Sequence, residues 1–194
     1  MKRDEVQELH YITPIENLPS ILRYGIQSNR RAKVGRKKGL IDPASVAMDE
    51  VQSLRDKIHV PEGRPLHDYA NLYLCARNPM LFKRKEQHET LCVLRISPAV
   101  LDIPGVIVTD MNAASGICRF APAPEGLDMV DTEMVFAEDW RHPGDFAGYL
   151  RHRAVKCAEV LVPDQVPARF IMGAHVSCDA SRGALQAVAA GLVV

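Results

Sequence analysis

Short apolar runs separated by polar turns recur along most of the chain, and they predict a series of strands. Runs of four to eight residues that are rich in β-branched and apolar side chains are typical of strands. The predicted strands are residues 8–13, 71–76, 90–96, 106–109, 133–137, 159–162 and 170–175. Residues 145–156 and 181–190 instead favour helices near the end of the chain.

The first predicted strand leads directly into a helix. Residues 13–16, Thr-Pro-Ile-Glu, form a capping-box pattern with threonine at the N-cap and proline at the first helical position. Ile15, Leu18 and Leu22 then recur at helical spacing. Gly25 follows as the expected C-cap, because glycine readily adopts the left-handed conformation found there. The pattern predicts a helix of about ten residues that starts at the end of a strand.

A second early helix is predicted to start near Asp42 and to end before Pro61. Its apolar stripe consists of Ala47, Val51, Leu54 and Ile58. Arg55 follows Leu54, so we expect it at the edge of that apolar face. Two early helices followed by many short strands indicate an α+β fold with mixed or antiparallel sheets, because strand and helix do not alternate regularly.

Length and composition favour one domain that spans residues 1–194. The chain is 47% hydrophobic and 25% charged, which are ordinary values for a globular protein. No apolar run approaches the ~20 residues of a membrane helix, and the first ten residues lack the apolar core of a secretory signal. We therefore expect a cytoplasmic protein with no membrane partner. The five cysteines are odd in number and show no CxxC spacing, so neither a disulfide framework nor a metal site is expected.

The net charge of zero conceals a strong asymmetry. Residues 29–38 carry six basic side chains and no acidic one, residues 125–139 are acidic, and residues 151–156 are again basic. Such runs are often only solvated faces. They can also form a footprint for a polyanion, since a neutral protein binds nucleic acid when its basic residues converge.

Common catalytic motifs are absent from the sequence. It contains no Walker A, GxGxxG, HExxH or GxSxG motif, which removes the usual nucleotide hydrolases, Rossmann enzymes, zinc proteases and α/β-hydrolases. His10 and Tyr11 could simply occupy the two faces of a strand, and Arg55 could be a solvated charge. Glu159 is more informative, because it opens an apolar strand where an acid has low propensity. Such an acid lies at a sheet rim or is placed for chemistry.

Taken in order, three stretches resemble the DarT-type DNA ADP-ribosyltransferases, toxins whose fold is related to the poly(ADP-ribose) polymerases. Residues 10–25 (HYITPIENLPSILRYG) are similar to the family's opening strand and helix. Residues 51–81 include LHDY and NLYLCARNPML, and residues 156–162 read KCAEVLV around Glu159. The triplet VTD at 108–110 also matches. The resemblance covers roughly residues 8–175 and implies an ADP-ribosyltransferase fold that uses NAD to modify a base of single-stranded DNA.

The resemblance also implies roles for individual residues. Glu159 and Arg55 match the catalytic positions. The residues implied in NAD binding are His10, Tyr11, Ile12, Thr13, Ser20, Ser28 and Tyr73. Those implied in nucleic-acid binding are Arg77, Met80, Arg151 and Arg153. No metal is implied, and the expected partner is an antitoxin of the macrodomain ADP-ribosyl hydrolase type.

The chemistry suits this assignment. Loss of nicotinamide from NAD leaves positive charge on the ribose, and a carboxylate such as Glu159 stabilises that charge. A helix N-terminus near Pro14 and neighbouring hydroxyls can donate to the pyrophosphate.

Two departures from the family pattern bear on specificity. Tyr11 stands where the family often has the histidine of a HIT triplet, and Asn71-Leu72 and ARNPM replace a proline–phenylalanine pair and PRSPM. These differences favour guanine over thymine as the target base. Two other functions remain open: an NAD-dependent RNA 2′-phosphotransferase, and a non-catalytic nucleic-acid-binding module of the same fold.

Overall fold

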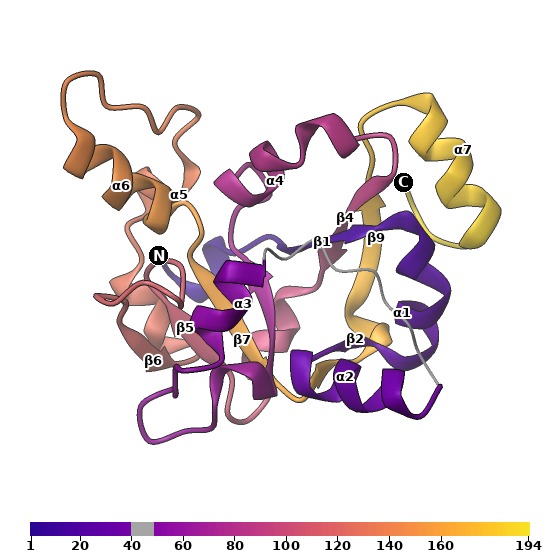
Figure 1. The fold of residues 1–194 in the computed structure, drawn as a ribbon, viewed down its shortest axis with the longest axis horizontal. Coiled ribbons are helices and arrows are strands. Elements are labelled where there is room, and N and C mark those ends of the chain that lie inside the picture. The colour runs from indigo at the N-terminus through magenta and orange to yellow at the C-terminus, as the bar shows by residue number, and fades with distance from the viewer. Residues whose placement is uncertain (40–48) are drawn as a thin grey trace.

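The computed structural model describes residues 1–39 and 49–194, and a seven-stranded sheet of order β6-β5-β7-β3-β1-β4-β9 forms its centre (Figure 1). The strands of this sheet are β1 (Leu9–Pro14), β3 (Tyr69–Tyr73), β4 (Leu91–Ile96), β5 (Ile107–Thr109), β6 (Phe120–Pro122), β7 (Glu159–Pro163) and β9 (Ile171–His175). A separate pair is formed by β2 (Ile26–Gln27) and β8 (Gln165–Val166). Neighbouring strands in both sheets run antiparallel.

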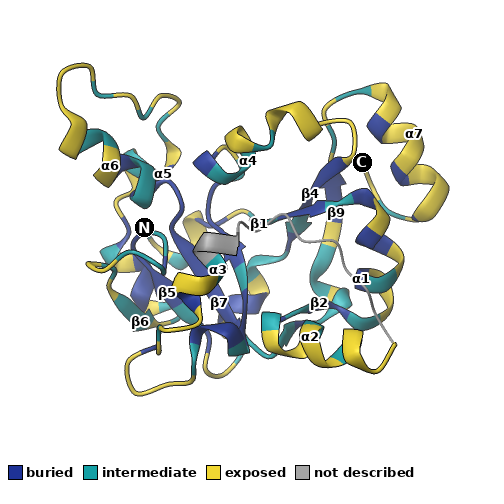
Figure 2. Ribbon diagram, viewed as in Figure 1, coloured by how far each residue is buried: buried dark blue, intermediate teal, exposed yellow. Residues whose placement is uncertain are grey.

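The helices surround this sheet. The α-helices are α1 (Leu18–Tyr24), α2 (Asn29–Lys37), α3 (Asp49–Arg55), α4 (Pro79–Lys83), α5 (Thr132–Phe136), α6 (Phe146–Val155) and α7 (Asp179–Val188). Short 3-10 helices occupy Arg3–Glu5, Ile15–Asn17, Leu66–Asp68, Lys85–Gln87, Pro98–Asp102, Glu125–Met129 and Ala168–Phe170. Figure 2 shows that the strands at the centre are buried, whereas the outer faces of α2, α4 and α7 are exposed. None of the described helices is long and apolar enough to cross a membrane.

The sheet divides where β1 meets β3. Along its whole length β1 pairs with β4, from Leu9 opposite Ile96 to Pro14 opposite Leu91. In contrast, β1 meets β3 at the single register position of His10 and Tyr73. Beyond that position the two strands separate. The sheet therefore consists of two halves that are joined at one point, and an opening between them is available for a ligand.

The two faces of the sheet have different compositions. Strand side chains alternate between faces, and one face carries an apolar series that includes Leu9, Leu72 and Leu94 and packs into the main core. On the other face, Ile12 and Tyr73 form a smaller cluster. Glu159 is directly opposite Tyr73 in the β3–β7 register, so its side chain projects from this second face.

Most of the predicted strands are confirmed, but the segment predicted at 133–137 is helical as far as Phe136. It belongs to α5, where the Asp131 side chain accepts a hydrogen bond of 3.0 Å from the backbone N–H of Met134. This local cap satisfies a backbone donor that would otherwise lack a partner. The prediction from β-branched content was wrong because capping favours the helix here. The helices predicted over 145–156 and 181–190 are confirmed as α6 and α7.

The first predicted helix exists, but it begins later than expected. Thr13 and Pro14 belong to β1, a 3-10 turn follows, and α1 starts at Leu18. Thr13 is therefore not an N-cap; its Oγ1 accepts a hydrogen bond of 3.1 Å from the side chain of Asn17. Gly25 ends the helix as predicted, with a φ of 79°.

The second predicted helix differs more from expectation. Its expected start at Asp42 and the stripe residue Ala47 lie outside the described residues. Within α3, Leu54 is 54% exposed, whereas Arg55 is only 6% exposed. The arginine that was expected at the edge of an apolar face is thus the buried side chain of the pair.

Gly25→Ala is expected to destabilise the protein by about 2 kcal/mol or more, because alanine disfavours a positive φ and its Cβ would clash. A Cβ at Gly25 would clash with the backbone oxygen of Val166. Urea unfolding would measure the loss. Gly116→Ala is the matched control, since a Cβ there meets nothing within 4 Å. Equal stabilities of the two variants would contradict this account.

Candidate active site

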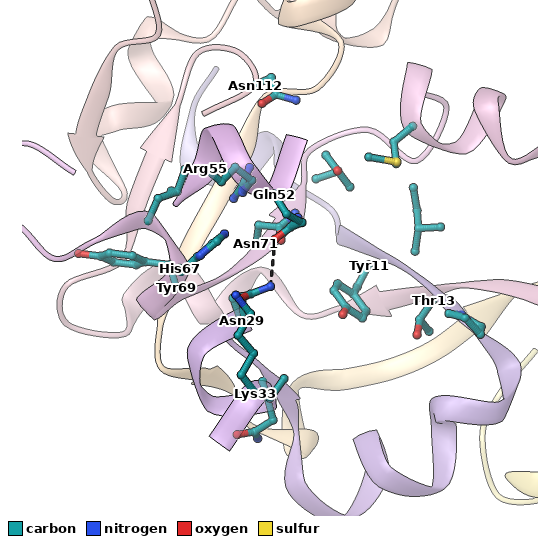
Figure 3. A pocket seen from close by; sticks show the side chains of 18 of the residues that line it. Tyr11, Thr13, Asn29, Lys33, Gln52, Arg55, His67, Tyr69, Asn71 and Asn112 are labelled. Carbon is teal, nitrogen blue, oxygen red and sulfur yellow. Dashed lines mark hydrogen bonds between the residues drawn. The ribbon is translucent and has the colours of Figure 1, made fainter. Parts of the chain in front are cut away.

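A cleft of about 210 Å³ lies where β1 and β3 separate (Figure 3). One wall comes from β1 and the other from β3 together with the 3-10 turn before it. Helices α2 and α3 contribute the remaining sides. The lining residues are Tyr11, Ile12, Thr13, Pro14, Gln27, Asn29, Ala32, Lys33, Arg36, Gln52, Arg55, Leu66, His67, Tyr69, Ala70, Asn71, Tyr73, Met80 and Asn112.

A buried ion pair lies beside this cleft. The two terminal nitrogens of Arg55 each donate a hydrogen bond of 3.0 Å to one carboxylate oxygen of Glu159. The side chains of Arg55 and Glu159 are 8% and 0% exposed. Glu159 is therefore not a rim acid, because β7 lies between β5 and β3 inside the sheet. Burial, the largest single influence, lowers the pKa of Arg55, but the charge of Glu159 and the hydrogen bonds to it together outweigh burial and raise that pKa.

The backbone around Glu159 is held by the neighbouring strand. The Oγ1 of Thr109 accepts a hydrogen bond of 2.9 Å from the N–H of Glu159 and donates one of 2.7 Å to the carbonyl of Met111. Thr109 belongs to the VTD triplet seen in the sequence. This bridge connects the start of β7 to the loop after β5, so the position of the carboxylate is set by two segments.

Two tyrosines that line the cleft supply neutral hydroxyls. Burial is the main reason that the pKa of Tyr73 lies well above its usual range, and the charge of Glu159 adds to the effect. Burial also raises the pKa of Tyr11 to about 12. Both phenols keep their protons near neutral pH, so each can donate a hydrogen bond to a ligand in the cleft.

Part of the basic run at 29–38 lines the cleft. It forms α2, in which Asn29, Lys33 and Arg36 share one face and border the cleft. The side chain of Asn29 also donates a hydrogen bond of 2.9 Å to that of Gln52, which joins α2 to α3 across the opening (Figure 3). The cleft thus has a cationic side suited to an anion.

His67 presents an unsatisfied nitrogen to the cleft. Its Nδ1 is 3.0 Å from a carboxylate oxygen of Asp56, which requires a proton on Nδ1. Its Nε2 is buried and has no partner among the described residues. Burial lowers the pKa of His67 despite the opposing effect of Asp56. The ring is therefore neutral near pH 7, and Nε2 is a hydrogen-bond acceptor.

A second, open groove of about 260 Å³ continues from the cleft. Met80 and Asn112 line both of them. The other residues of this groove are Leu54, Pro79, Lys83, Ala114, Ser115, Leu150, Arg153, Ala154 and Cys157. The groove combines exposed apolar side chains with the cations Lys83 and Arg153. We call it the acceptor groove below.

Arg77 lies elsewhere, on a third and larger groove beside Phe82 and Trp140. It is 3.8 Å from a carboxylate oxygen of Glu138.

The basic stretch at 151–156 does not present all of its charges to solvent. Arg151 is exposed, and Arg153 lies over the ring of Tyr149. Lys156 is buried, and its Nζ donates to the carbonyls of Val135 and Ala137 at 2.7 and 2.8 Å. The expected contribution of Lys156 to a nucleic-acid surface is therefore wrong.

The structure brings together part of the set of residues assigned to NAD. Tyr11, Ile12, Thr13 and Tyr73 line the cleft together with Arg55. Outside this lining lie Ser20, on α1, and Ser28, which is buried and accepts from the N–H of Arg31 as the N-cap of α2.

His10 is also outside the lining. It is 8% exposed, and its Nδ1 is 3.9 Å from a carboxylate oxygen of Glu8. Burial is the main cause of its lowered pKa.

Several lining residues were not singled out as site residues in the sequence: Gln27, Asn29, Lys33, Arg36, Gln52, His67, Asn71 and Asn112. The basic run and the LHDY segment signalled three of them, Lys33, Arg36 and His67. No sequence pattern distinguishes the isolated amides from surface residues. Among the residues that the structure describes, no group of three His, Cys, Asp or Glu side chains could hold a metal ion.

Comparison with known proteins agrees with this geometry. A family model described as "ssDNA thymidine ADP-ribosyltransferase, DarT" matches residues 10–192. A DNA ADP-ribosyl transferase–DNA ADP-ribosyl glycohydrolase fusion protein from Thermosipho africanus (strain H17ap60334) is 29% identical over 174 residues, which are 88% of this chain and 42% of the fusion protein. The chain therefore spans less than half of that relative.

Two solved structures have the same fold. Thermus sp. 2.9 DarT in complex with ADP-ribosylated ssDNA matches with a TM-score of 0.79 and 25% identity, over 97% of this chain and 90% of the other. Thermus sp. 2.9 DarT in complex with NAD+ matches with a TM-score of 0.73 and 24% identity, over 95% and 88% of the two chains.

Arg55→Met is expected to lower the free energy of unfolding by about 3 kcal/mol, because it leaves the buried Glu159 carboxylate without its partner. Glu159→Ala should also destabilise the protein, in contrast to the small effect expected of a rim acid. Thermal and urea unfolding would measure both variants.

The matched control for this prediction is Arg64→Met. It removes an ion pair of similar length, 2.9 Å to Asp164, between two side chains that are about half exposed. Little change is expected there, since exposed pairs contribute little. If Arg55→Met were as stable as Arg64→Met, the buried pair would not be structural.

Proposed function

Because this chain belongs to the DarT family of single-stranded DNA ADP-ribosyltransferases, we propose that it transfers ADP-ribose from NAD to a base of single-stranded DNA. The observation that carries the proposal is the buried Arg55–Glu159 pair beside a cleft with a cationic side. We propose that residues 1–194 act as a single ADP-ribosyltransferase domain in the cytoplasm, where NAD and DNA are both available.

The reaction exchanges one bond at the nicotinamide ribose for another. The bond between C1 of this ribose and the pyridinium nitrogen breaks, and its electron pair neutralises the departing nicotinamide. A nitrogen of the DNA base then bonds to the same carbon and releases a proton. Positive charge accumulates on the ribose at the transition state, and the Glu159 carboxylate stabilises it by charge attraction.

Arg55 has a double effect on this step. It holds both carboxylate oxygens of Glu159 in a fixed orientation. The positive ribose also competes with the guanidinium for the same carboxylate. Arg55 is therefore released in part as the ribose charge develops, and it can then stabilise negative charge on the acceptor base. It does not act as a base itself, because arginine stays protonated.

The cleft offers matching groups for the rest of NAD. Lys33 and Arg36 on α2 suit the negative pyrophosphate. Nε2 of His67 can accept a hydrogen bond from a ribose hydroxyl. Tyr11 and Tyr73 form apolar walls with a donor at the end of each ring.

The acceptor base is proposed to arrive through the acceptor groove. Exposed Leu54 and Leu150 offer apolar surface to a base, and Lys83 and Arg153 can neutralise phosphates. Met80 lies where the groove joins the cleft. Arg77 and Arg151 remain proposals for contacts with flanking nucleotides.

Thymine is the first candidate for the target base, because the matching family is described as acting on thymidine. Guanine remains the second candidate, since the Asn71-Leu72 and ARNPM departures favour it.

The relative from Thermosipho africanus joins its transferase to an ADP-ribosyl glycohydrolase. We therefore also propose an ADP-ribosyl hydrolase of the macrodomain type as the antitoxin partner. Neither the RNA 2′-phosphotransferase nor the non-catalytic module is favoured.

Glu159→Gln is expected to reduce transfer to single-stranded DNA by about 1,000-fold or more, because it removes the charge that stabilises the ribose cation. NAD binding should change far less, and calorimetry would verify this. Mass spectrometry of the oligonucleotide would quantify the product. Glu16→Gln is the control for loss of one acidic charge, because Glu16 is the exposed residue of the 3-10 turn Ile15–Asn17. Wild-type transfer by Glu159→Gln would rule out the assigned role.

The target base can be identified with four oligonucleotides that each lack one base type. With NAD and the wild-type protein, three should gain one ADP-ribose and the fourth none. A thymine enzyme fails on the strand without thymine, and a guanine enzyme fails on the strand without guanine. Transfer to duplex DNA should be weaker, since a stacked and paired base cannot reach the cleft without being extruded. If none of the four strands were modified, the proposed function would be refuted.

A further inference from the structure

Asn112 occupies the junction between the NAD cleft and the acceptor groove. It lines the cleft together with Arg55 (Figure 3), and it lines the groove together with Met80 and Leu150. We propose that Asn112 determines base specificity by donating a hydrogen bond to a keto oxygen of the acceptor base. The proposal rests on the function proposed above and adds the chemical feature by which the base is recognised.

The orientation of the Asn112 amide is set by its neighbours. Its Oδ1 accepts a hydrogen bond of 2.8 Å from the N–H of Ala114. A flipped amide would place two donors against each other, so the oxygen must face Ala114. The Nδ2 group then points away from this turn. It makes no hydrogen bond with any of the described residues, and it is the only polar group of Asn112 that remains for a ligand.

The backbone of Asn112 is anchored as firmly as its side chain. Its N–H donates a hydrogen bond of 2.9 Å to the carbonyl of Ala154 at the end of α6, and its carbonyl accepts one of 2.8 Å from Ser115. The same loop is joined to the start of β7 through Thr109, which bonds to the N–H of Glu159. The donor of Asn112 is therefore held in a fixed relation to the catalytic carboxylate.

A fixed donor distinguishes two classes of base. The oxygen at C4 of thymine or at C6 of guanine accepts from Nδ2, whereas cytosine and adenine carry an exocyclic amine at that position. An amine facing Nδ2 would leave two donors without acceptors. Such a mismatch strongly lowers transfer to the wrong base. For thymine, donation to an oxygen beside N3 also stabilises the negative charge that develops as the N3 proton leaves.

Asn112→Asp tests the donor while it keeps the local turn. An aspartate oxygen still accepts from the N–H of Ala114, but the Nδ2 donor becomes a second acceptor. Transfer to the preferred keto-base oligonucleotide should fall by about 10- to 100-fold. The dissociation constant for NAD should stay within about two-fold if the effect is confined to the base. Gln7→Glu is the control for added negative charge, because Gln7 is exposed and lies outside both the cleft and the groove. Unchanged transfer by Asn112→Asp would overturn the proposal.

Asn112→Ser is the second variant. Because serine is neutral, this variant separates loss of the amide donor from the effect of an added negative charge. A serine hydroxyl can also accept from the N–H at the second following residue, but it cannot replace the amide donor. Near-UV circular dichroism would verify the fold of both variants.

Equilibrium binding separates failure of this proposal from failure of the proposed function. Fluorescence anisotropy with short oligo-dT and oligo-dC strands should give tighter wild-type binding to oligo-dT, and both variants should lose most of that preference. Retained preference in both variants would exclude Asn112 as the reader. A wild-type protein that shows the preference but transfers nothing would instead refute the reaction and leave the base-reading role supported.

Discussion

The buried ion pair between Arg55 and Glu159 connects segments that lie 104 residues apart in the chain. Removing both charges from water costs several kcal/mol per ion, and the attraction offsets this only when the geometry is good. Here both nitrogens of the guanidinium meet both carboxylate oxygens at 3.0 Å. The pair thereby anchors the short helix α3 on the sheet and holds the buried carboxylate in a fixed position beside the cleft. The same charge that catalysis would use is thus one on which the local structure depends.

The cleft lies where the pairing between β1 and β3 stops. A sheet that was fully bonded between β1 and β3 would leave no room between its halves. Since the two strands meet only at His10 and Tyr73, the opening beyond them is lined by backbone and side chains of both halves. Helix α2 closes one side with Lys33 and Arg36, so the cavity acquires positive charge in a protein whose net charge is zero. Net charge is therefore a poor guide to the ligand of this chain, because binding depends on local charge.

The cleft and the acceptor groove share Met80 and Asn112, and this arrangement would suit the proposed transfer between two substrates. The cleft has cations for a pyrophosphate, while the acceptor groove has apolar surface and its own cations. Met80 and Asn112 stand between them. A side chain placed there can contact an incoming base without also holding the nucleotide donor.

The sequence alone determined the α+β class, most of the strands, Gly25 as a helix end and the unusual placement of an acid, Glu159, at the start of an apolar strand. These features depend on local patterns: apolar runs, left-handed backbone positions, and an acid at the start of an apolar strand. A local pattern also gave one wrong prediction: the segment expected as a strand at 133–137 is part of helix α5, which Asp131 caps.

Tertiary structure alone decided that Arg55 is buried and that Lys156 is not part of a charged surface. Both outcomes require a partner remote in sequence: a carboxylate for Arg55 and two backbone carbonyls for Lys156. The role proposed for Asn112 also depends on tertiary structure, because the groups around an isolated amide determine what it can bind. Burial and partnership depend on contacts between distant segments, and no spacing along the chain encodes those contacts directly.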